Sequence, residues 1–216
     1  MFKPDKVFVI NLLRRPDRLG RFRKDCPLTD YQIINGFDVL FPNIEKLQEL
    51  KLFFSNKFDN LHFIGEKGVW LSHLRIWKYI LQKNISKALI FEDDAKFSDC
   101  FSEIFDNINI HDFDILYIGG RFDDKFVMPS AIPITDKIVK HNFAENQHGW
   151  ELDRTAHAYI LSNRGAKILV DKFEETEYVN AVDTFIMHTF RDLNIPIYNT
   201  NPLICYCPLV SDSDIR

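Results

Sequence analysis

Short apolar runs without polar alternation are the feature that most constrains how this chain of 216 residues folds. "KVFVINL" (6–12) and "KALIFE" (87–92) place apolar side chains on both faces of an extended strand. Such a strand must be covered on both faces, which is typical of a parallel sheet flanked by helices. "DFDILYIGG" (112–120) and "TAHAYILS" (155–162) predict two more buried strands, and "YQIING" (31–36) predicts a shorter one.

Helical patterns separate these runs. The clearest covers residues 65–84, where Trp70, Leu74, Trp77 and Leu81 recur at helical spacing. Trp70 and Trp77 are expected to be core anchors rather than platforms on which a sugar stacks. Other helices are expected with Pro16 in the first turn, over 44–54, after Ser162 and over 181–193, and residues 121–150 are expected to be irregular. Strands alternating with helices predict an α/β fold with a mainly parallel central sheet, in one domain spanning 1–216.

Composition and charge exclude several classes of protein. Hydrophobic residues make up 46% of the chain, which excludes a largely disordered protein. The formal net charge of −4 gives no basic footprint for nucleic acid, so no nucleic-acid partner is expected. No window approaches the ~18 apolar residues of a membrane span, and the N-terminal apolar run lacks a signal-peptide cleavage site. The four cysteines form no C-x-x-C pair, so we expect reduced thiols and a cytoplasmic location, with peripheral membrane association left open.

Three consecutive acids, Glu92, Asp93 and Asp94, end the run at 87–92. Ligands of open α/β sheets bind outside the carboxyl ends of strands, which is where these acids lie. Alternation along an extended strand points Glu92 and Asp94 to one side and Asp93 to the other. Two neighbouring carboxylates suit Mg²⁺ or Mn²⁺, with substrate phosphates as further ligands. Alternatively, Asp93 or Asp94 caps a turn while the others face solvent.

The chain lacks the usual glycine-rich phosphate loops. It has neither the glycines and lysine of a P-loop nor a G-x-G-x-x-G motif. A phosphate bound at this edge of the sheet is therefore expected to be held through a metal ion.

Seven segments follow one another along the chain: "VFVINLLRRPDR", "GVWLSHLRIWKYIL", "ALIFEDDAKF", "DILYIGG", "AYILSNRGAKIL", "AVDTFI" and "SDSDIR". In this order they resemble glycosyltransferase family 25, which contains bacterial lipooligosaccharide galactosyltransferases and collagen hydroxylysine galactosyltransferases. Each motif is weak alone, but together they cover nearly the whole chain. The resemblance implies a GT-A fold with Rossmann-like nucleotide-sugar binding, a UDP-galactose or UDP-glucose donor, Mn²⁺ or Mg²⁺, and inversion at the anomeric carbon. It also implies a saccharide or hydroxylysine acceptor.

The same resemblance implies roles for the acids. Glu92, Asp93 and Asp94 look like the family's counterpart of the D-x-D motif, with Glu92 and Asp94 as metal ligands and Glu92 and Asp93 at the donor. A metal ion bridging the donor phosphates would stabilise the charge on the departing UDP.

Four further residues match the parts of the family that lie near the donor. Asn11 and Arg18 match the first strand and loop, and the planar fork of an arginine can hold phosphate or ribose oxygens. The alternative for this arginine-rich segment is a solvated helix face. Ser72 and His73 in "WLSH" match a segment near the donor, although a lone histidine in a helix is more often a hydrogen-bonded packing residue.

Two glycines and one aspartate complete the candidate site. Gly119 and Gly120 end a strand at the same edge as the acids and would let the backbone approach a sugar closely. Asp183 in "AVDTFI" matches the family's P-V-D motif, with Ala181 in place of the proline. Inverting transfer needs a base, and the expected helix start at Asp183 favours a charged carboxylate. A plain helix acid and a further metal ligand are the alternatives for Asp183.

The sequence thus predicts a metal-dependent inverting hexosyltransferase, and two rivals stay open. A nucleotidyltransferase would share the sheet and the acidic metal site, but it usually adds a basic pyrophosphate loop that this chain lacks. A non-catalytic carbohydrate-binding protein of the same fold would bind neither metal nor UDP.

Overall fold

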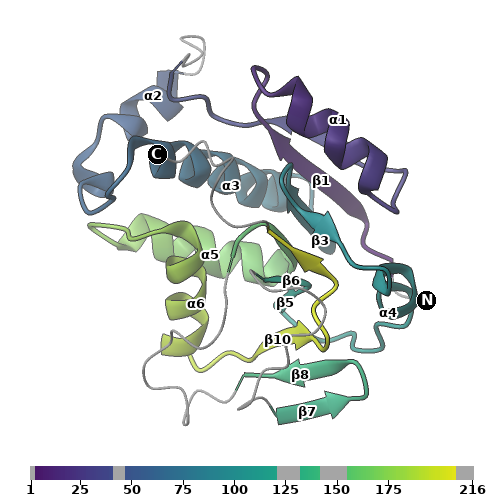
Figure 1. Ribbon diagram of the computed structural model, residues 1–216. Helices are drawn as coiled ribbons and strands as arrows, with labels where there is room; N and C mark the ends of the chain where they lie inside the picture. The colour runs from purple at the N-terminus through teal and green to yellow at the C-terminus, as the bar shows by residue number, and fades with distance from the viewer. Residues whose placement is uncertain (1–2, 41–46, 121–131, 142–154, 208–216) are drawn as a thin grey trace.

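The computed structural model describes residues 3–40, 47–120, 132–141 and 155–207, and Figure 1 shows their arrangement around one large sheet. In spatial order its strands are β2 (Gln32–Asn35), β1 (Lys6–Asn11), β3 (Lys87–Glu92), β9 (Ala158–Ser162), β5 (Ile115–Tyr117), β10 (Ile197–Thr200), β8 (Ile138–Lys140) and β7 (Ile132–Thr135). β1 pairs in parallel with β2 and β3, and β10 pairs in parallel with β5. β9 is antiparallel to both β3 and β5, so those two strands run the same way. The predicted α/β fold with a mainly parallel sheet is confirmed.

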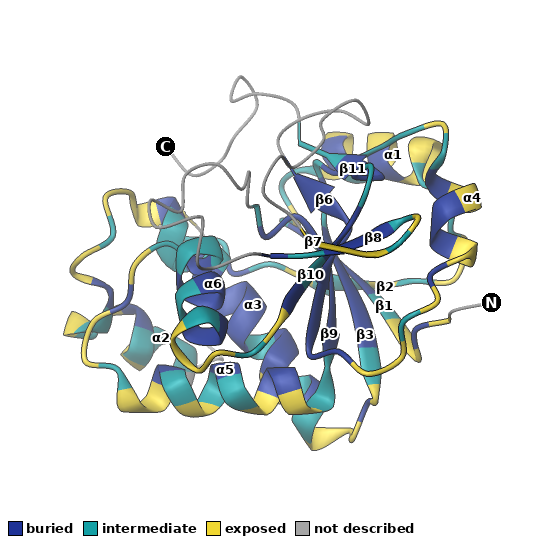
Figure 2. Ribbon diagram, turned by 90° about the horizontal axis from the view of Figure 1, so that it is seen from below, coloured by how far each residue is buried: buried dark blue, intermediate teal, exposed yellow. Residues whose placement is uncertain are grey.

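Helices cover both faces of the sheet. Their bounds are α1 (Pro16–Asp25), α2 (Leu47–Phe53), α3 (Ile64–Gln82), α4 (Phe101–Asp106), α5 (Asn163–Glu175) and α6 (Val182–Asp192), with a 3₁₀ turn at Asn56–Phe58. Figure 2 shows α3, α5 and α6 on one side of the sheet and α1 and α4 on the other. The layers are therefore helix, sheet and helix.

Two hydrophobic cores explain the unbroken apolar runs. On β3, Ala88 and Ile90 belong to the core beneath α3 and α5, whereas Leu89 and Phe91 belong to the core beneath α1 and α4. Successive side chains of a strand point to opposite faces, so a strand covered on both faces needs apolar residues at every position. The same alternation points the side chain of Glu92, the last residue of β3, toward the face of the sheet that α3 covers.

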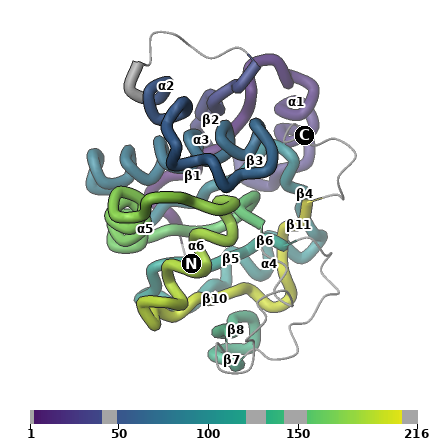
Figure 3. Tube along the Cα trace, turned by 90° about the vertical axis from the view of Figure 1, so that its left-hand side faces the viewer, coloured from purple at the N-terminus to yellow at the C-terminus, as the bar shows by residue number. Residues whose placement is uncertain are grey.

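Several predicted boundaries are wrong. The strand expected over 112–120 ends at Tyr117, and Gly119–Gly120 forms β6 in a second sheet with β11 (Cys205–Tyr206) and β4 (Lys96–Phe97). Figure 3 shows these three short strands side by side. The strand leaves the main sheet because the Ile118 carbonyl accepts from Ile204 and Cys205.

Three other boundaries also differ. The strand expected over 155–162 begins only at Ala158, and a β7–β8 hairpin occupies part of the stretch expected to be irregular. Of the helix expected over 44–54, residues 44–46 lie outside the described residues.

Asp114 anchors α5 to the edge of the sheet opposite the acids. Its buried carboxylate accepts from Ser162 Oγ at 2.9 Å and from Arg164 Nε and Nη2 at 2.8 and 2.9 Å. Ser162 in turn caps α5, because its Oγ accepts from the Gly165 N–H at 2.8 Å. One carboxylate therefore joins β5, the end of β9 and the start of α5.

Replacing Asp114 by alanine is expected to lower the free energy of unfolding by about 2–3 kcal/mol, because Ser162 and Arg164 lose a charged acceptor. Urea unfolding followed by circular dichroism measures the change. Asp112→Ala is the matched control, since Asp112 is 96% exposed and 3.6 Å from the same arginine. Its effect should stay below about 0.5 kcal/mol. Equal losses in the two variants would contradict the anchor.

Candidate functional site

A turn follows β3 and sets the directions of the three acids. The Ala95 N–H donates to the Glu92 carbonyl at 3.2 Å, so Asp93 and Asp94 occupy the centre of a turn. The alternation of side-chain directions along the extended strand therefore stops at Glu92. The prediction that Asp94 shares a side with Glu92 is therefore wrong: Glu92 contacts α3, whereas Asp93 and Asp94 both contact Arg18 on α1.

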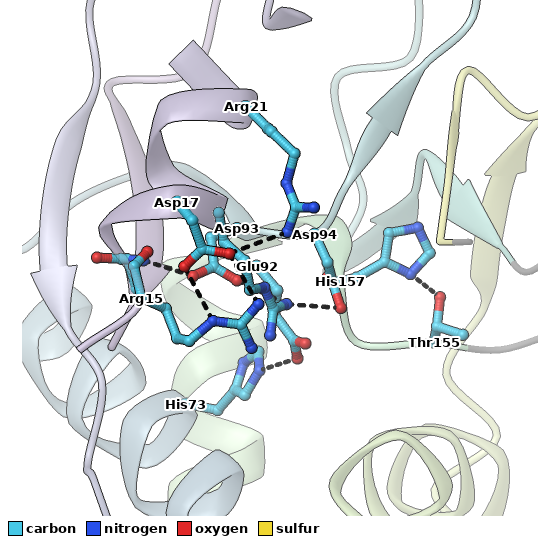
Figure 4. Close-up of polar contacts among 11 residues, drawn as sticks. Arg15, Asp17, Arg21, His73, Glu92, Asp93, Asp94, Thr155 and His157 are labelled. Carbon is cyan, nitrogen blue, oxygen red and sulfur yellow. Dashed lines mark hydrogen bonds and ion pairs between the residues drawn. The ribbon is translucent and has the colours of Figure 1, made fainter. Parts of the chain in front are cut away.

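Arg18 bridges the two aspartates of this turn. Its Nη2 lies 2.6 Å from Asp93 Oδ1 and 2.8 Å from Asp94 Oδ2. The Asn11 amide, at the end of β1, donates to Asp93 Oδ2 at 2.5 Å and to the Arg15 carbonyl at 3.0 Å. Both oxygens of Asp93 thus have partners from the protein. Figure 4 shows the three acids gathered together, with His73 reaching Glu92.

The acids carry more negative charge than Arg18 alone can offset. Burial raises the pKa of Asp93 to about 6, although the Arg18 charge and the Asn11 hydrogen bond oppose this rise. Burial and the neighbouring charge of Glu92 raise the pKa of Asp94 to about 6. Asp94 Oδ1 is buried without a hydrogen-bond partner at normal distance among the described residues, although the Cys207 thiol is close enough to the Asp94 side chain to oppose the rise of its pKa. Asp94 therefore keeps an oxygen for a ligand that brings positive charge.

Glu92 is held from the other side by α3. Burial raises the pKa of Glu92, but the hydrogen bond with His73 and the nearby positive charge, including that of Arg18, together outweigh burial, so the pKa lies below its usual value. His73 Nε2 lies 3.1 Å from Glu92 Oε1, and His73 Nδ1 lies 2.8 Å from the Tyr159 hydroxyl. Both ring nitrogens of His73 are thus occupied by protein atoms. In this structure His73 orients Glu92, and its contact with a donor stays a prediction.

A pocket opens beside the acids at the carboxyl ends of β1 and β3. Its apolar lining comes from the end of β1, the segment after β2 and the first turns of α3: Ile10, Leu12, Phe37, Val39 and Val69. Its polar lining comprises Arg14, Arg18, Ser72, His73, Glu92, Asp93 and Asp94. An apolar cleft that ends in a few convergent charged groups is the usual form of a small-molecule site.

Ser72 and Gly68 hold one wall of this pocket in place. Ser72 Oγ accepts from the Phe37 N–H at 2.8 Å and donates to the Gly68 carbonyl at 2.7 Å. A Cβ added at Gly68 would lie 2.7 Å from the Phe37 carbonyl oxygen and 3.0 Å from Val39 Cγ1. Only glycine lets α3 approach the chain after β2 this closely. Through its two hydrogen bonds Ser72 positions this wall of the pocket. A contact of Ser72 with a donor stays a prediction.

The glycine pair of β6 packs against protein atoms. A Cβ at Gly119 would lie 2.7 Å from both His157 Nε2 and Ala158 Cβ. Neither Gly119 nor Gly120 is among the residues that line the pocket. The close approach at Gly119 is made by β9, and an approach of a sugar to either glycine stays a prediction.

Asp183 lies in the first turn of α6, where its Oδ1 accepts from the Thr184 N–H at 2.6 Å. α6 packs on α3 through Phe185 and Trp70, whose ring centroids lie 4.8 Å apart. Trp70 also donates to the Asn180 carbonyl at 2.7 Å, so α3 fixes the entry to α6. The residues that line the pocket do not include Asp183, and its role as a base stays a prediction.

The described residues contain no group of three or more His, Cys, Asp or Glu side chains arranged to hold a metal ion. Glu92 and Asp94 nevertheless supply hard oxygen donors, and Asp94 Oδ1 is buried without a partner. Magnesium and manganese ions commonly take only one or two protein carboxylates and complete their shell with phosphate and water. The residues present therefore fit such an ion if a phosphate ligand comes with it.

The model of glycosyltransferase family 25 (LPS biosynthesis protein) matches residues 4–186. The chain belongs to glycosyltransferase family 25. Procollagen galactosyltransferase 1 of Danio rerio is 26% identical over 98% of this chain and 34% of its own length. Procollagen galactosyltransferase 2 of Homo sapiens is 24% identical over 94% of this chain and 35% of its own length. A glycosyltransferase 25 family member of Drosophila melanogaster is 24% identical over 94% of this chain and 35% of its own length.

This family-25 chain spans about a third of the length of these curated relatives. The resemblance read from the seven motifs is confirmed. Across the described residues, no helix combines the length and the apolar character needed to cross a bilayer. The cytoplasmic location and the single-domain organisation stay predictions.

Several side chains that shape the site were not predicted from the sequence. Phe37 and Val39 line the pocket, and Tyr159 and Trp77 bond to the network that holds Glu92. Trp77 is a core anchor as predicted, because it is fully buried. A tyrosine in a buried strand needs a partner for its hydroxyl, and that need was the available signal for Tyr159.

Gly68→Ala is expected to lower the free energy of unfolding by about 1–3 kcal/mol, because the new methyl group meets a backbone oxygen rather than a movable side chain. Gly20→Ala on α1 is the control, since a Cβ there meets nothing within 4 Å. That change should raise the free energy of unfolding by up to about 1 kcal/mol. Urea unfolding compares both variants, and a neutral Gly68→Ala would disprove the close approach of α3.

Proposed function

We propose that this chain is a metal-dependent, inverting glycosyltransferase of the GT-A type. It would transfer a hexose, galactose in the first instance, from a UDP-sugar to a hydroxyl group of a saccharide or a hydroxylysine. The supporting observation is the acid cluster at the carboxyl end of β3, next to a pocket, in a chain of family 25. The names of the relatives, procollagen galactosyltransferases, favour galactose and a collagen-like acceptor.

The pocket supports a nucleoside diphosphate as the ligand. Its apolar walls, which include Leu12, Phe37 and Val39, would receive the base and ribose. Its charged end would receive the diphosphate, and Arg18 supplies a fixed guanidinium there. A diphosphate alone would be repelled by Glu92 and Asp94, so the proposal requires a cation at these carboxylates.

Glu92 and Asp94 would hold Mn²⁺ or Mg²⁺. When bound, such an ion acts as a Lewis acid that stabilises charge on the departing diphosphate. The protein's own contribution is to fix the two carboxylates: His73 holds Glu92 Oε1, and Arg18 holds Asp94 Oδ2. Asn11 and Arg18 keep Asp93 engaged, so Asp93 would act as a support for Arg18.

Inversion requires the acceptor hydroxyl to attack the sugar from the face opposite the diphosphate while a base takes its proton. Asp183 is the base we propose, because the start of α6 favours its charged form. The contact between Trp70 and Asn180 ties the start of α6 to the helix that carries His73.

Thermal unfolding tests the ligand. Mn²⁺ with UDP at 100 times the Kd should stabilise the fold by about 2.7 kcal/mol, which raises Tm by roughly 5–10 °C. A larger shift with UTP would favour a nucleotidyltransferase, and a shift with galactose alone would favour a carbohydrate-binding protein. Absence of any Mn²⁺-dependent shift with UDP would refute the proposal.

Asp94→Asn should abolish this shift, because the amide removes one charged ligand of the cation. Asp171→Asn is the control, since Asp171 is 54% exposed on α5 and pairs with Lys167. Asp183→Asn should keep the shift but lose release of UDP from UDP-galactose in the presence of acceptor. A shift that survives Asp94→Asn would place the cation elsewhere.

A further inference from the structure

A buried chain of hydrogen bonds runs from α3 through β9 to Glu92. Trp77 Nε1 donates to the Tyr159 hydroxyl at 2.9 Å, that hydroxyl lies 2.8 Å from His73 Nδ1, and His73 Nε2 lies 3.1 Å from Glu92 Oε1. Trp77, Tyr159 and His73 are fully buried. We call these three residues the relay.

The donor and acceptor at each step of the relay follow from Trp77. An indole N–H can only donate, so the Tyr159 oxygen accepts from it. The single hydroxyl hydrogen of Tyr159 then serves His73 Nδ1, which must be the acceptor. The proton of His73 is therefore on Nε2, which donates to Glu92 Oε1. If His73 instead carried a proton on Nδ1, the Tyr159 hydrogen would be buried with no acceptor among the described residues, which is costly.

The fold keeps this geometry fixed. His73 and Trp77 lie one helical turn apart on α3, and Tyr159 on β9 pairs with Ile90, two residues before Glu92 on β3. The rings of His73 and Tyr159 stack with centroids 5.7 Å apart at an interplanar angle of 26°. Sheet and helix thus clamp the imidazole from two sides.

We propose that the relay positions Glu92 as a ligand for a cation, with Tyr159 and Trp77 acting through His73. The Nε2–H of His73 holds Oε1 and leaves Oε2 outside the relay, available to a cation. Groups that orient a metal ligand in this way commonly change metal affinity by about 10- to 100-fold when they are removed. The proposal rests on the proposed function for the identity of the ligand, but the arrangement of protons does not depend on it.

Nitrogen NMR of the wild-type protein tests the proton arrangement without any ligand. The protein is labelled with ¹⁵N-histidine, and the His73 signals are assigned by their loss in His73→Gln. The proposal predicts that Nε2 carries a proton and that Nδ1 does not. A proton on Nδ1, in the neutral or the charged ring, would overturn the relay.

Tyr159→Phe tests the consequence for the ligand. It removes one hydroxyl from the centre of the relay, and Mn²⁺ affinity at saturating UDP, read by electron paramagnetic resonance of free Mn²⁺, should fall at least about tenfold. Tyr117→Phe is the matched control, because Tyr117 is also buried and lies directly opposite Tyr159 on β5. Its Mn²⁺ affinity should match that of the wild type.

The outcomes separate the two proposals. Equal Mn²⁺ affinity in the two tyrosine variants would overturn the relay while leaving the proposed function intact. If the wild type binds no Mn²⁺ with UDP, the proposed function fails, and the protonation of His73 decides the relay alone. The same measurement decides it if Tyr159→Phe does not fold.

Discussion

The contact of Arg18 with Asp93 and Asp94 is the interaction on which the site depends. Three consecutive carboxylates at the end of a buried strand repel one another and lose hydration, and both effects disfavour their charged forms. Arg18 Nη2 lies within 2.8 Å of an oxygen of each aspartate. Asn11 and His73 add hydrogen bonds from β1 and α3. Arg18 offsets only part of the negative charge of the three acids, which leaves the site prepared for a further positive charge.

The order of the strands brings these partners together. β1 and β3 are parallel neighbours, so Asn11 and Glu92 end at the same edge of the sheet. Arg18 reaches that edge from α1 on one face, and His73 reaches it from α3 on the other. The antiparallel strand β9 then places Tyr159 between β3 and β5, within reach of His73. Each layer of the fold thus contributes one contact to the acids.

Much of this arrangement was predictable from the sequence because it depends on local patterns. The unbroken apolar runs required a sheet covered on both faces, and the acids at the end of 87–92 marked the edge where a ligand binds. The direction of Asp94 was not predictable, since it depends on the turn closed by Ala95 and on Arg18. The relay was not predictable either, because Tyr159 and His73 are 86 residues apart and meet only through the placement of β9.

The surroundings of Gly119 and Gly120 were not predictable from the sequence either. A strand that ends in two glycines predicts close approach of something to the backbone, but the sequence does not say what approaches. In the structure His157 and Ala158 lie against Gly119, and the chain moves into a second sheet. Tertiary packing decides which residues lie against a glycine. The local sequence therefore predicts only that something approaches the backbone closely at that position.

The proposed function requires the acids at the end of β3 to hold a cation together with a nucleoside diphosphate. Anomalous scattering from crystals grown with MnCl₂ and UDP tests it most directly. One manganese peak is expected within coordinating distance of Glu92 and Asp94, with the diphosphate on the same ion and beside Arg18. A bound UDP with no manganese between Glu92 and Asp94, or a manganese peak elsewhere on the protein, would contradict it.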